Sequence, residues 1–501
     1  MNERIYVCHT FYHVYVTCLK ELTIRREAAY AAGEADRVRL KERAEGVAAV
    51  NGDAIYRIDT FEKTNTYNRG KENEKTSIDK RNNDTHKDND IPSIHKRDYD
   101  TPGTATLILS KMSTDFDSLV DRARASGLFA DVIEFDEKRD DYFEELVPLR
   151  KNTGSIVSNM FNRIRFCKRF PELEAPYVPV DFRQYRDIYV FCDSDPVGYY
   201  LNANGISYHA VEDGLNCLKR FDAARFDNRG AFPVKRWMAK KGYIFIQNGY
   251  AKHCLDMEVN DLSALPVDAD GVKIAYEAED KTARDGDMHR AKADAMAAKR
   301  ARAIASGKKP VYVELPRRVL ADALTKTDKL VLTRLFIENI DELKAALAQG
   351  DASLRQEGQQ ADRPRVLILT EKILDADARR KLFTELVTRY AMWKGQQALV
   401  FVKPHPRDEV DYRAIFPPES DGADSPDSAQ ANGGGASSNA ARPDVIVLSS
   451  AFPMEMLNFI EGLRFDAVVS IFTQTDDIMF AAERVSLAEE FAYAAPELQQ
   501  G

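Results

Sequence analysis

The chain has 501 residues, of which 44% are hydrophobic and 10% aromatic, and its formal net charge at pH 7 is -9. This length exceeds what one ordinary core needs, so it favours two domains of α/β size. The acidic balance argues against a nucleic-acid partner, because a nucleic-acid-binding protein normally presents a basic face. No run approaches the roughly 18 apolar residues that a membrane-spanning helix needs.

The six cysteines form no CxxC pair and no spacing typical of a zinc site. Such a distribution favours reduced thiols in a cytosolic protein. The first strand is expected to begin near Arg4, so we expect no signal peptide before it. The sequence therefore predicts a cytoplasmic protein.

Strands and helices alternate along the first half of the chain. Apolar runs predict strands at residues 4–8, 104–110, 131–135, 187–192 and 207–213, and helices are expected from about residues 11, 114, 154 and 194. Strands that are apolar almost throughout and alternate with helices indicate a parallel sheet covered on both faces.

Three segments interrupt the pattern. Residues 30–103 are highly polar and predict a disordered insertion, and residues 418–443 predict a flexible loop. Residues 257–308 are charged and rich in alanine, and we interpret them as an exposed insertion with helical tendency.

A second α/β series begins near residue 365. Its strands are predicted at 365–370, 398–403, 444–449 and 467–472, with helices near 376–394 and 453–462 and a helix start after 472. We therefore expect one Rossmann-like domain over residues 1–325 and another over residues 326–501. Two such domains facing across a cleft form the GT-B architecture, and ligands bind such sheets at the carboxyl ends of the strands.

The first candidate site follows the strand at 207–213. Glu212 and Asp213 are adjacent carboxylates that would raise each other's pKa, which suits a general base, and Gly214 allows a tight turn. A solvated acidic turn is the alternative interpretation.

The second candidate site is His405, the last of the eight histidines in the chain. Pro404 and Pro406 each fix their own φ, and Pro406 also favours extended geometry at His405. The imidazole could donate a proton or a hydrogen bond to a leaving phosphate, while Lys403 and Arg407 supply positive charge. A prolyl turn that ends a strand is the alternative.

The strand at 444–449 is followed by a third candidate site. Ser449 and Ser450 precede a helix expected to begin near Pro453, and the first backbone N–H groups of that helix would bind an anion. Glu455 would accept hydrogen bonds from ribose hydroxyls. Simple helix capping explains the same pattern.

Two further strand ends carry polar groups. Thr473 and Gln474 offer donors that would hold a phosphate without a metal, and ordinary capping explains them equally well. Thr370 ends a strand, and Asp375 and Asp377 lie near the next helix start, where capping is the default for one of them.

Two patterns imitate metal sites. Asp193 and Asp195 resemble a metal-binding Asp-x-Asp pair, but Asp195 precedes Pro196 and is better interpreted as a helix N-cap. His9 and His13 have the spacing of helical zinc ligands without a third ligand. His9 is expected in the turn after the first strand, where it could contact an acceptor. We expect no metal and no cofactor.

Taken in chain order, several segments resemble the glycosyltransferases of family 52. They are YVCHTFYHVYV, VEDGLN, LILTEKILD, VKPHPRD, FPMEMLNFI and SIFTQTDD. That family includes bacterial lipooligosaccharide α-2,3-sialyltransferases and related enzymes of capsule and exopolysaccharide synthesis. The resemblance covers most of the chain outside the three insertions, and the order and spacing of the short motifs give it specificity.

The resemblance implies a GT-B fold and an inverting, metal-independent reaction. A sialic acid or similar sugar would move from a CMP-sugar to a hydroxyl of a cell-surface glycan. Work at the inner face of the membrane is expected, and both peripheral membrane contact and a homodimer stay open. Three alternatives also stay open: a UDP-glucose-type donor, a CMP-Kdo-type donor, and a non-catalytic glycan- or nucleotide-binding protein.

The resemblance also implies roles for particular residues. Asp213 and its two neighbours would face the active cleft, and His405 with Pro406 would assist departure of CMP. An aspartate after the first strand of the second domain would be the general base; LTEKILD is longer than the family pattern, and Asp375 is the nearest match. Glu455 would contact the ribose or base, and the Thr473 segment the phosphate.

Overall fold

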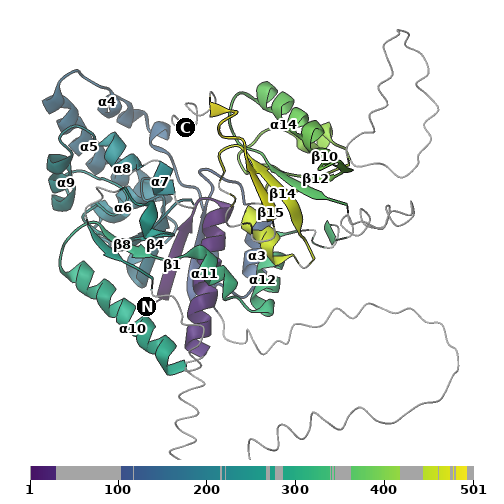
Figure 1. Ribbon diagram of the computed structural model, residues 1–501. Helices are drawn as coiled ribbons and strands as arrows, with labels where there is room; N and C mark the ends of the chain where they lie inside the picture. Colours follow the sequence, from purple (N-terminus) through teal and green to yellow (C-terminus); the bar gives the residue numbers. More distant parts are fainter. Residues whose placement is uncertain are drawn as a thin grey trace, which may run out of the picture. The chain divides into compact units, whose positions relative to one another are not determined.

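The computed structural model describes residues 2–29, 103–116, 118–214, 217–220, 222–266, 271–276, 286–338, 340, 343–344, 363–417, 444–460, 462–473, 475, 478 and 481–492. Almost all of the insertion expected at 30–103, and the whole loop expected at 418–443, lie outside these residues. The described residues within 2–23, 103–276 and 294–492 belong to one compact unit, which holds both sheets (Figure 1).

The first half of the chain forms one sheet of eight strands. These are β1 (Asn2–Cys8), β2 (Ala105–Ser110), β3 (Asp131–Phe135), β4 (Tyr185–Phe191), β5 (Tyr208–Val211), β6 (Cys254–Val259), β7 (Val272–Ile274) and β8 (Val311–Glu314). All neighbours pair in parallel. The expected parallel α/β class is therefore confirmed for this half.

The strand order of this sheet creates a switch point beside β1. The order is β3-β2-β1-β4-β5-β6-β8-β7, so β2 and β3 extend the sheet on one side of β1, and β4 and the later strands extend it on the other. In open parallel sheets, ligands bind outside the carboxyl ends of the two strands at which the order reverses. Here those ends are Cys8 and Phe191.

Helices follow most of these strands. They are a helix over residues 11–29, α3 (Leu119–Ala125), α4 (Val147–Arg150), α5 (Ile156–Glu174), α6 (Pro196–Ala203), α7 (Cys217–Arg220), α8 (Ala223–Asp227), α9 (Phe232–Lys241), α10 (Gly286–Ala305), α11 (Arg317–Asp322) and α12 (Lys326–Phe336). Ser155 caps α5 by accepting the backbone N–H of Ser158, and Thr325 and Asp328 form a capping box at the start of α12.

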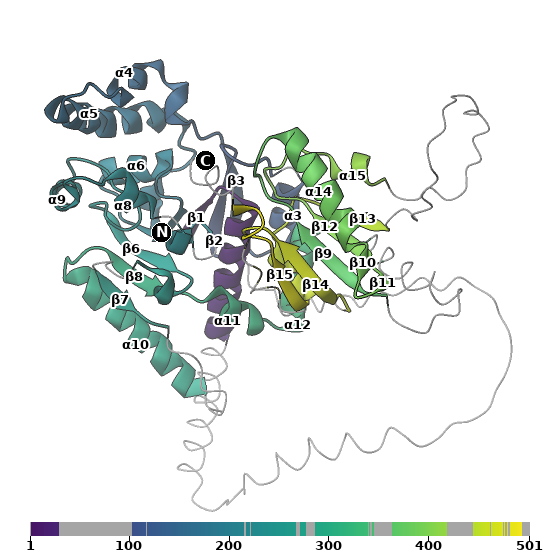
Figure 2. The ribbon, with the colours of Figure 1, turned by 45° about the horizontal axis from the view of Figure 1, so that its top comes forward.

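The interpretation of residues 257–308 as an exposed insertion is wrong, but their expected helical tendency is confirmed by α10 (Gly286–Ala305). This segment contains the end of β6, the whole of β7 and the helix α10, which runs alongside β7 and β8 (Figures 1 and 2). Its charged residues resemble those of a solvated insertion, because the residues that pair with them are distant in the chain. Arg300 of α10 binds the buried carboxylates of Asp256 at 2.6 Å and Glu258 at 3.1 Å.

The second half forms a separate parallel sheet of five strands. These are β9 (Arg365–Leu369), β12 (Leu399–Lys403), β13 (Val445–Val447), β14 (Phe465–Ser470) and β15 (Ala481–Ser486). Their order is β13-β12-β9-β14-β15, and all pairings are parallel. The sheet repeats the doubly wound pattern, with its switch point between β9 and β14.

Helices of the second half depart from expectation in two places. The segment expected to be a helix at 453–462 is a short 3-10 helix, η8 (Met454–Phe459). The helix α14 (Ala376–Tyr390) ends four residues early, because a hairpin of β10 (Met392–Trp393) and β11 (Gln396–Gln397) follows. Lys394 and Gly395 turn this hairpin with positive φ values of 49° and 83°.

Each sheet has its own hydrophobic core. Val7, Ile108 and Val190 are fully buried in the first core, and Val366, Val400 and Val469 are fully buried in the second. The domain boundary expected between residues 325 and 326 falls between α11 and α12 and stays a prediction. No helix among the described residues is both long and apolar enough to cross a membrane.

Candidate functional site

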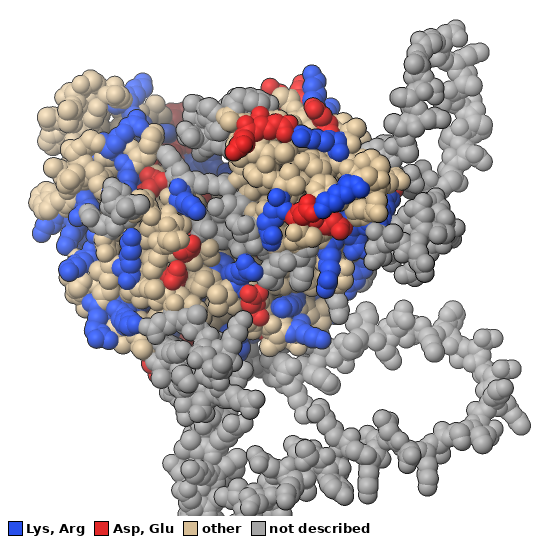
Figure 3. All heavy atoms as spheres, viewed as in Figure 1, with Lys and Arg blue, Asp and Glu red and all other residues tan. Residues whose placement is uncertain are grey.

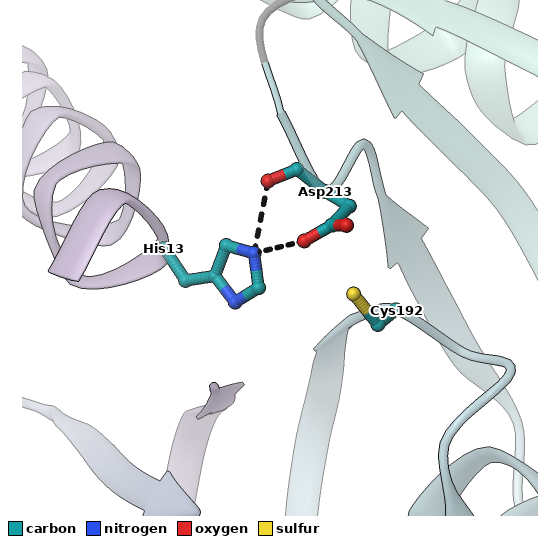
Figure 4. A group of neighbouring side chains, drawn as sticks. All are labelled: His13, Cys192 and Asp213. Atoms are coloured by element: carbon teal, nitrogen blue, oxygen red, sulfur yellow. Dashed lines mark hydrogen bonds and ion pairs between the residues drawn. The ribbon is translucent and has the colours of Figure 1, made fainter. Parts of the chain in front are cut away.

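The switch point of the first sheet brings His13 against Asp213 (Figure 4). His13 lies on the helix that follows β1, and Asp213 lies two residues after the end of β5. The Nε2 of His13 is 2.6 Å from Oδ1 of Asp213. The Nδ1 of His13 accepts the backbone N–H of His9 at 3.0 Å. This bond leaves the ring proton on Nε2, so the neutral imidazole donates it to the carboxylate. Burial lowers the pKa of His13, which keeps the ring neutral.

Asp213 is the accessible member of this pair. Its side chain is 55% exposed, whereas the side chain of His13 is fully buried. Burial by itself would raise the pKa of Asp213, but hydrogen bonds from His13 and Cys192 outweigh it and hold that pKa below its usual range. The site therefore offers an ionised carboxylate, fixed in direction and open to solvent.

Cys192 completes the group drawn in Figure 4. It follows β4 with a φ of 52°, a left-handed conformation that is unusual for a residue other than glycine. The ligand atoms of His13, Cys192 and Asp213 lie within 4.8 Å of one another, close enough to suggest a metal. The histidine does not fit one, because a metal-binding imidazole donates its second N–H. In His13 the nitrogen that would have to donate, Nδ1, is an acceptor, and the nitrogen that would have to bind the metal, Nε2, carries the proton.

His9 is a buried neighbour of His13 and is paired with a carboxylate. It is 1% exposed, and its Nε2 donates to the buried carboxylate of Glu137 at 2.8 Å. Burial by itself would lower the pKa of His9, but Glu137 and Asp195 outweigh it and raise that pKa to about 9. Glu137 also accepts from Ser110 at 2.7 Å and from the backbone of Val197 at 2.8 Å. His9 and Glu137 thus link the segments that follow β1 and β4 to the end of β2, and the contact of His9 with an acceptor stays a prediction.

The Asp-x-Asp pair does not converge on one point. Asp193 faces the interior, where it accepts from the Tyr208 hydroxyl at 3.1 Å and from the backbone N–H of Asn248 at 2.9 Å. Asp195 holds the N-cap position of α6 but makes no capping hydrogen bond, and its carboxylate is 3.5 Å from Nε2 of His9. Burial raises the pKa of Asp195 to about 7. Asp195 is therefore a titratable group that the capping interpretation missed.

Glu212 and Asp213 point in opposite directions. Glu212 is 1% exposed and accepts the backbone N–H of Asn260 at 2.7 Å. Burial raises its pKa, whereas the pKa of Asp213 is lowered, so the mutual rise expected for the two carboxylates is wrong. Gly214 does not adopt a positive φ, and the turn makes no special demand for glycine there.

Sequence reasoning missed Arg317, just beyond the end of β8 at the same edge of the first sheet. Its side chain is buried, and one guanidinium nitrogen, Nη1, donates to the carbonyl of Leu315 at 2.8 Å. Its Nε and Nη2 are buried and meet no acceptor within the described part of the chain. Two adjacent N–H groups of this kind match a carboxylate or a phosphate.

His405 lies two residues after the end of β12, in a turn whose backbone is held by hydrogen bonds. Its backbone N–H donates to Oγ1 of Thr370 at 2.9 Å, and its carbonyl accepts the backbone N–H of Asp408 at 2.9 Å. Its Nδ1 accepts the backbone N–H of Arg407 at 3.1 Å, so the neutral ring carries its proton on Nε2. Burial, with the charges of Arg407 and Lys403, lowers the pKa of His405 to about 4.

Lys403, which was expected to supply positive charge beside His405, is buried. It is 4% exposed, and its Nζ lies 4.4 Å from the centre of the Phe452 ring. Burial lowers its pKa to about 7, against the opposing effect of Glu455. Glu455 is itself buried. Pro406 and Arg407 are exposed beside His405.

A carboxylate already occupies the switch point of the second sheet. Glu371, after β9, accepts with Oε1 the backbone N–H groups of Ile471, Phe472 and Thr473 at 3.2, 2.8 and 2.6 Å. Three convergent N–H groups form an anion-binding nest. The backbone N–H of Thr473 is therefore bonded to Glu371, whereas the phosphate contact expected from the Thr473 segment stays a prediction. Gln474 lies outside the described residues.

The remaining candidates have local partners. Asp375 is the N-cap of α14 and accepts the backbone N–H of Ala378 at 2.9 Å, which matches the default interpretation. Ser449 accepts the backbone N–H of Ala451 at 3.1 Å, and Ser450 is partly exposed beside it. The helix expected after these serines is the 3-10 helix η8, and the anion site expected at its start stays a prediction.

Comparisons with known proteins do not show a family for this chain. No protein-family model and no curated protein matches the chain, so the family-52 resemblance is not confirmed. Among solved structures the chain is similar to the crystal structure of Medicago truncatula UGT71G1 complexed with UDP-glucose, at 14% identity and a TM-score of 0.24. The match covers 60% of this chain and 60% of that chain, so the chain spans less than two thirds of that protein.

Proposed function

We propose that this protein is an inverting, metal-independent glycosyltransferase. It moves a sialic acid or a similar sugar from a CMP-sugar to a hydroxyl of a cell-surface glycan. The observation that carries the proposal is the oriented carboxylate of Asp213, held by His13 at the switch point of a doubly wound sheet. A second doubly wound sheet, with His405 at the carboxyl end of β12, supplies the other half of the chemistry.

Asp213 acts as the general base in this proposal. Its carboxylate removes the proton of the acceptor hydroxyl while that oxygen attacks the anomeric carbon, and the bond from the anomeric carbon to the phosphate oxygen breaks. His13 keeps the carboxylate ionised and fixes its direction. Half exposure of the Asp213 side chain allows an acceptor to reach it.

His405 stabilises the departing nucleotide. The electron pair of the broken bond leaves on the CMP phosphate, and a neutral ring with its proton on Nε2 donates a hydrogen bond to that phosphate. Because the pKa of His405 is lowered to about 4, the ring is neutral near pH 7. It therefore donates a hydrogen bond, and proton transfer from an imidazolium fits this pKa less well. Arg407 is exposed nearby and adds positive charge.

Arg317 fits an anionic group of the substrate. The guanidinium is buried at the carboxyl edge of the first sheet, and two of its nitrogens meet no acceptor among the described residues. A buried cation of this kind is stabilised when a carboxylate or a phosphate pairs with it. Sialic acid, Kdo and a nucleotide each carry such a group, so this residue supports an anionic substrate without selecting one.

Asp195 is a second candidate for the base. Its pKa of about 7 suits proton abstraction near neutral pH better than the low pKa of Asp213. The pH dependence of turnover separates the two. Turnover that falls as the pH drops below about 7 assigns the base to Asp195, and turnover that stays level to much lower pH assigns it to Asp213.

The test is nucleotide release by the purified full chain. CMP-sialic acid, CMP-Kdo and UDP-glucose are each supplied with a panel of oligosaccharide acceptors, and the donor that turns over identifies the class. Asp213→Asn is expected to lower turnover by about 10²–10⁴-fold. Asp375→Asn is the matched control, because asparagine caps a helix as well as aspartate and the variant should keep its turnover.

Two results would overturn this assignment. Loss of turnover in Asp375→Asn, with turnover kept in Asp213→Asn, moves the base to the second sheet. Tight binding of a nucleotide sugar without release under any donor and acceptor pair identifies a non-catalytic binding protein instead.

A further inference from the structure

Large apolar side chains are exposed together on α5 and α9. Among the described residues, six of the eight large apolar side chains that are more than half exposed lie on α5, on α9 or just after α9. They are Ile156 (85%), Val157 (66%), Phe161 (63%), Val234 (56%), Trp237 (55%) and Tyr243 (53%). Exposed apolar surface concentrated in this way marks an interaction site more often than chance exposure.

Other residues of the two helices pack on one shared apolar cluster. Met160 and Ile164 of α5 join Phe232 and Met238 of α9 in one apolar cluster. Arg163 of α5 also donates to the carbonyl of Phe245 at 2.9 Å. The inner faces are thus satisfied, and the exposed apolar side chains belong to the outer faces.

Cations accompany these apolar side chains. Residues 156–169 of α5 and all of α9 (232–241) carry eight Lys and Arg residues and no Asp or Glu, although the whole chain has a net charge of -9. Helical spacing places Arg165 on the face of Val157 and Phe161, and Lys241 on the face of Trp237. Figure 3 shows Lys and Arg side chains beside uncharged surface on the flank formed by α5 and α9.

A cavity of about 420 Å³ adjoins α9. Trp237 and Tyr250 form part of its wall, and its lining includes four cations and no acid. Arg236 and Lys240 come from α9, and the other two cations come from the segment that precedes β8. The cavity therefore suits a negatively charged group beside an aromatic ring.

We propose that the outer faces of α5 and α9 dock on a membrane surface rich in anionic phospholipid. The apolar side chains enter the boundary between headgroups and acyl chains, and the Lys and Arg side chains meet the lipid phosphates. Trp237 and Tyr243 suit this depth, because aromatic rings with a polar edge gather at membrane interfaces. The cavity beside Trp237 receives a lipid phosphate. This surface is independent of the function proposed above.

The test is sedimentation of the full chain with lipid vesicles. One set contains phosphatidylcholine alone, and in the other about a third of the lipid is phosphatidylglycerol. The chain is expected to sediment with the anionic vesicles, and added salt should weaken the binding because it screens the charges. Arg165→Glu with Lys241→Glu should reduce the affinity for these vesicles by at least about 30-fold. Each cation near the membrane surface contributes roughly 1 kcal/mol to the binding free energy, and the double variant loses two of them.

Two matched controls carry substitutions in the second half of the chain, away from α5 and α9 in the sequence. Arg380→Glu with Lys381→Glu changes the same charge on the exposed face of α14, and Met392→Ser removes an apolar side chain that is 55% exposed. Both controls should bind as the wild type does. Phe161→Ser with Trp237→Ser should lose binding while keeping the thermal melting curve, because both side chains are exposed.

Three outcomes overturn the proposal. They are sedimentation with neither vesicle, equal sedimentation with both, and equal losses in the α14 control and the Arg165 variant. Binding of a soluble polyanion such as heparin, without binding to vesicles, assigns the surface to another kind of partner and also overturns it.

Discussion

The charge of His9 should make the stability of the first sheet depend on pH. Its pKa is raised from an unfolded value of 6.5 to about 9, although burial opposes the shift, because Glu137 and Asp195 face the ring. A group whose folded pKa is raised contributes stability that is complete below the unfolded pKa. That stability is lost as the pH rises through the folded pKa. The window therefore runs from about pH 6.5 to above pH 9.

The magnitude follows from the size of the rise. Each pH unit between the two pKa values is worth roughly 1.4 kcal/mol, so the contribution of His9 is about 3 kcal/mol. The side chain of His9 is only 2% exposed, and that of Glu137 is fully buried, so solvent screens the pair little. His9→Gln keeps a donor toward Glu137 and removes the charge.

Urea unfolding of the wild type and of His9→Gln at several pH values measures this contribution. The difference in unfolding free energy should be about 3 kcal/mol larger at pH 6 than at pH 10. Taking the difference removes titrating groups that do not face His9, such as Lys20, because both proteins share them.

His405→Gln is the matched control. The folded pKa of His405 is lowered to about 4, so its contribution is lost only as the pH falls, and its difference from the wild type should stay level between pH 7 and pH 10. A difference for His9→Gln that stays constant from pH 6 to pH 10 would refute the assignment of a charged His9.

Other variants test the strand ends. His405→Ala is expected to lower turnover by about 100-fold while donor binding changes little, which steady-state turnover and calorimetric binding together measure. Glu371→Ala should lower the unfolding free energy by at least about 2 kcal/mol in urea titrations, because three backbone N–H groups lose their acceptor. An unchanged midpoint would show that water replaces the carboxylate without cost. Gly198→Ala should cost about 2 kcal/mol or more in the same assay, since its Cβ would lie 1.9 Å from the carbonyl oxygen of Asp193. A variant as stable as the wild type would exclude that close approach.

Apolar runs predicted most strands correctly, because a parallel strand covered on both faces must be apolar almost throughout. β1, β2, β4, β9 and β14 all follow such runs and are confirmed. β6, β7, β8 and β15 were missed. β6 carries Asp256 and Glu258, which resemble surface residues until Arg300 is placed beside them.

The position of polar groups after the strands was also predictable, but the direction of each side chain was not. Glu212 and Asp213 are neighbours, yet one is buried against a backbone N–H and the other is half exposed. Lys403 was expected to supply positive charge after a strand, and only the structure shows that it is buried against Phe452.

The sequence by itself determined the α/β class, the prolyl turn around His405 and the position of polar groups after strands, because these depend on local periodicity and backbone stiffness. Only the tertiary structure decided the strand order, and with it the meeting of His13 with Asp213 and of His9 with Glu137. These partners are 200 and 128 residues apart in the chain. Protonation states depend on burial and on neighbours in space, so the chemistry of these groups became defined only when the sheet was assembled.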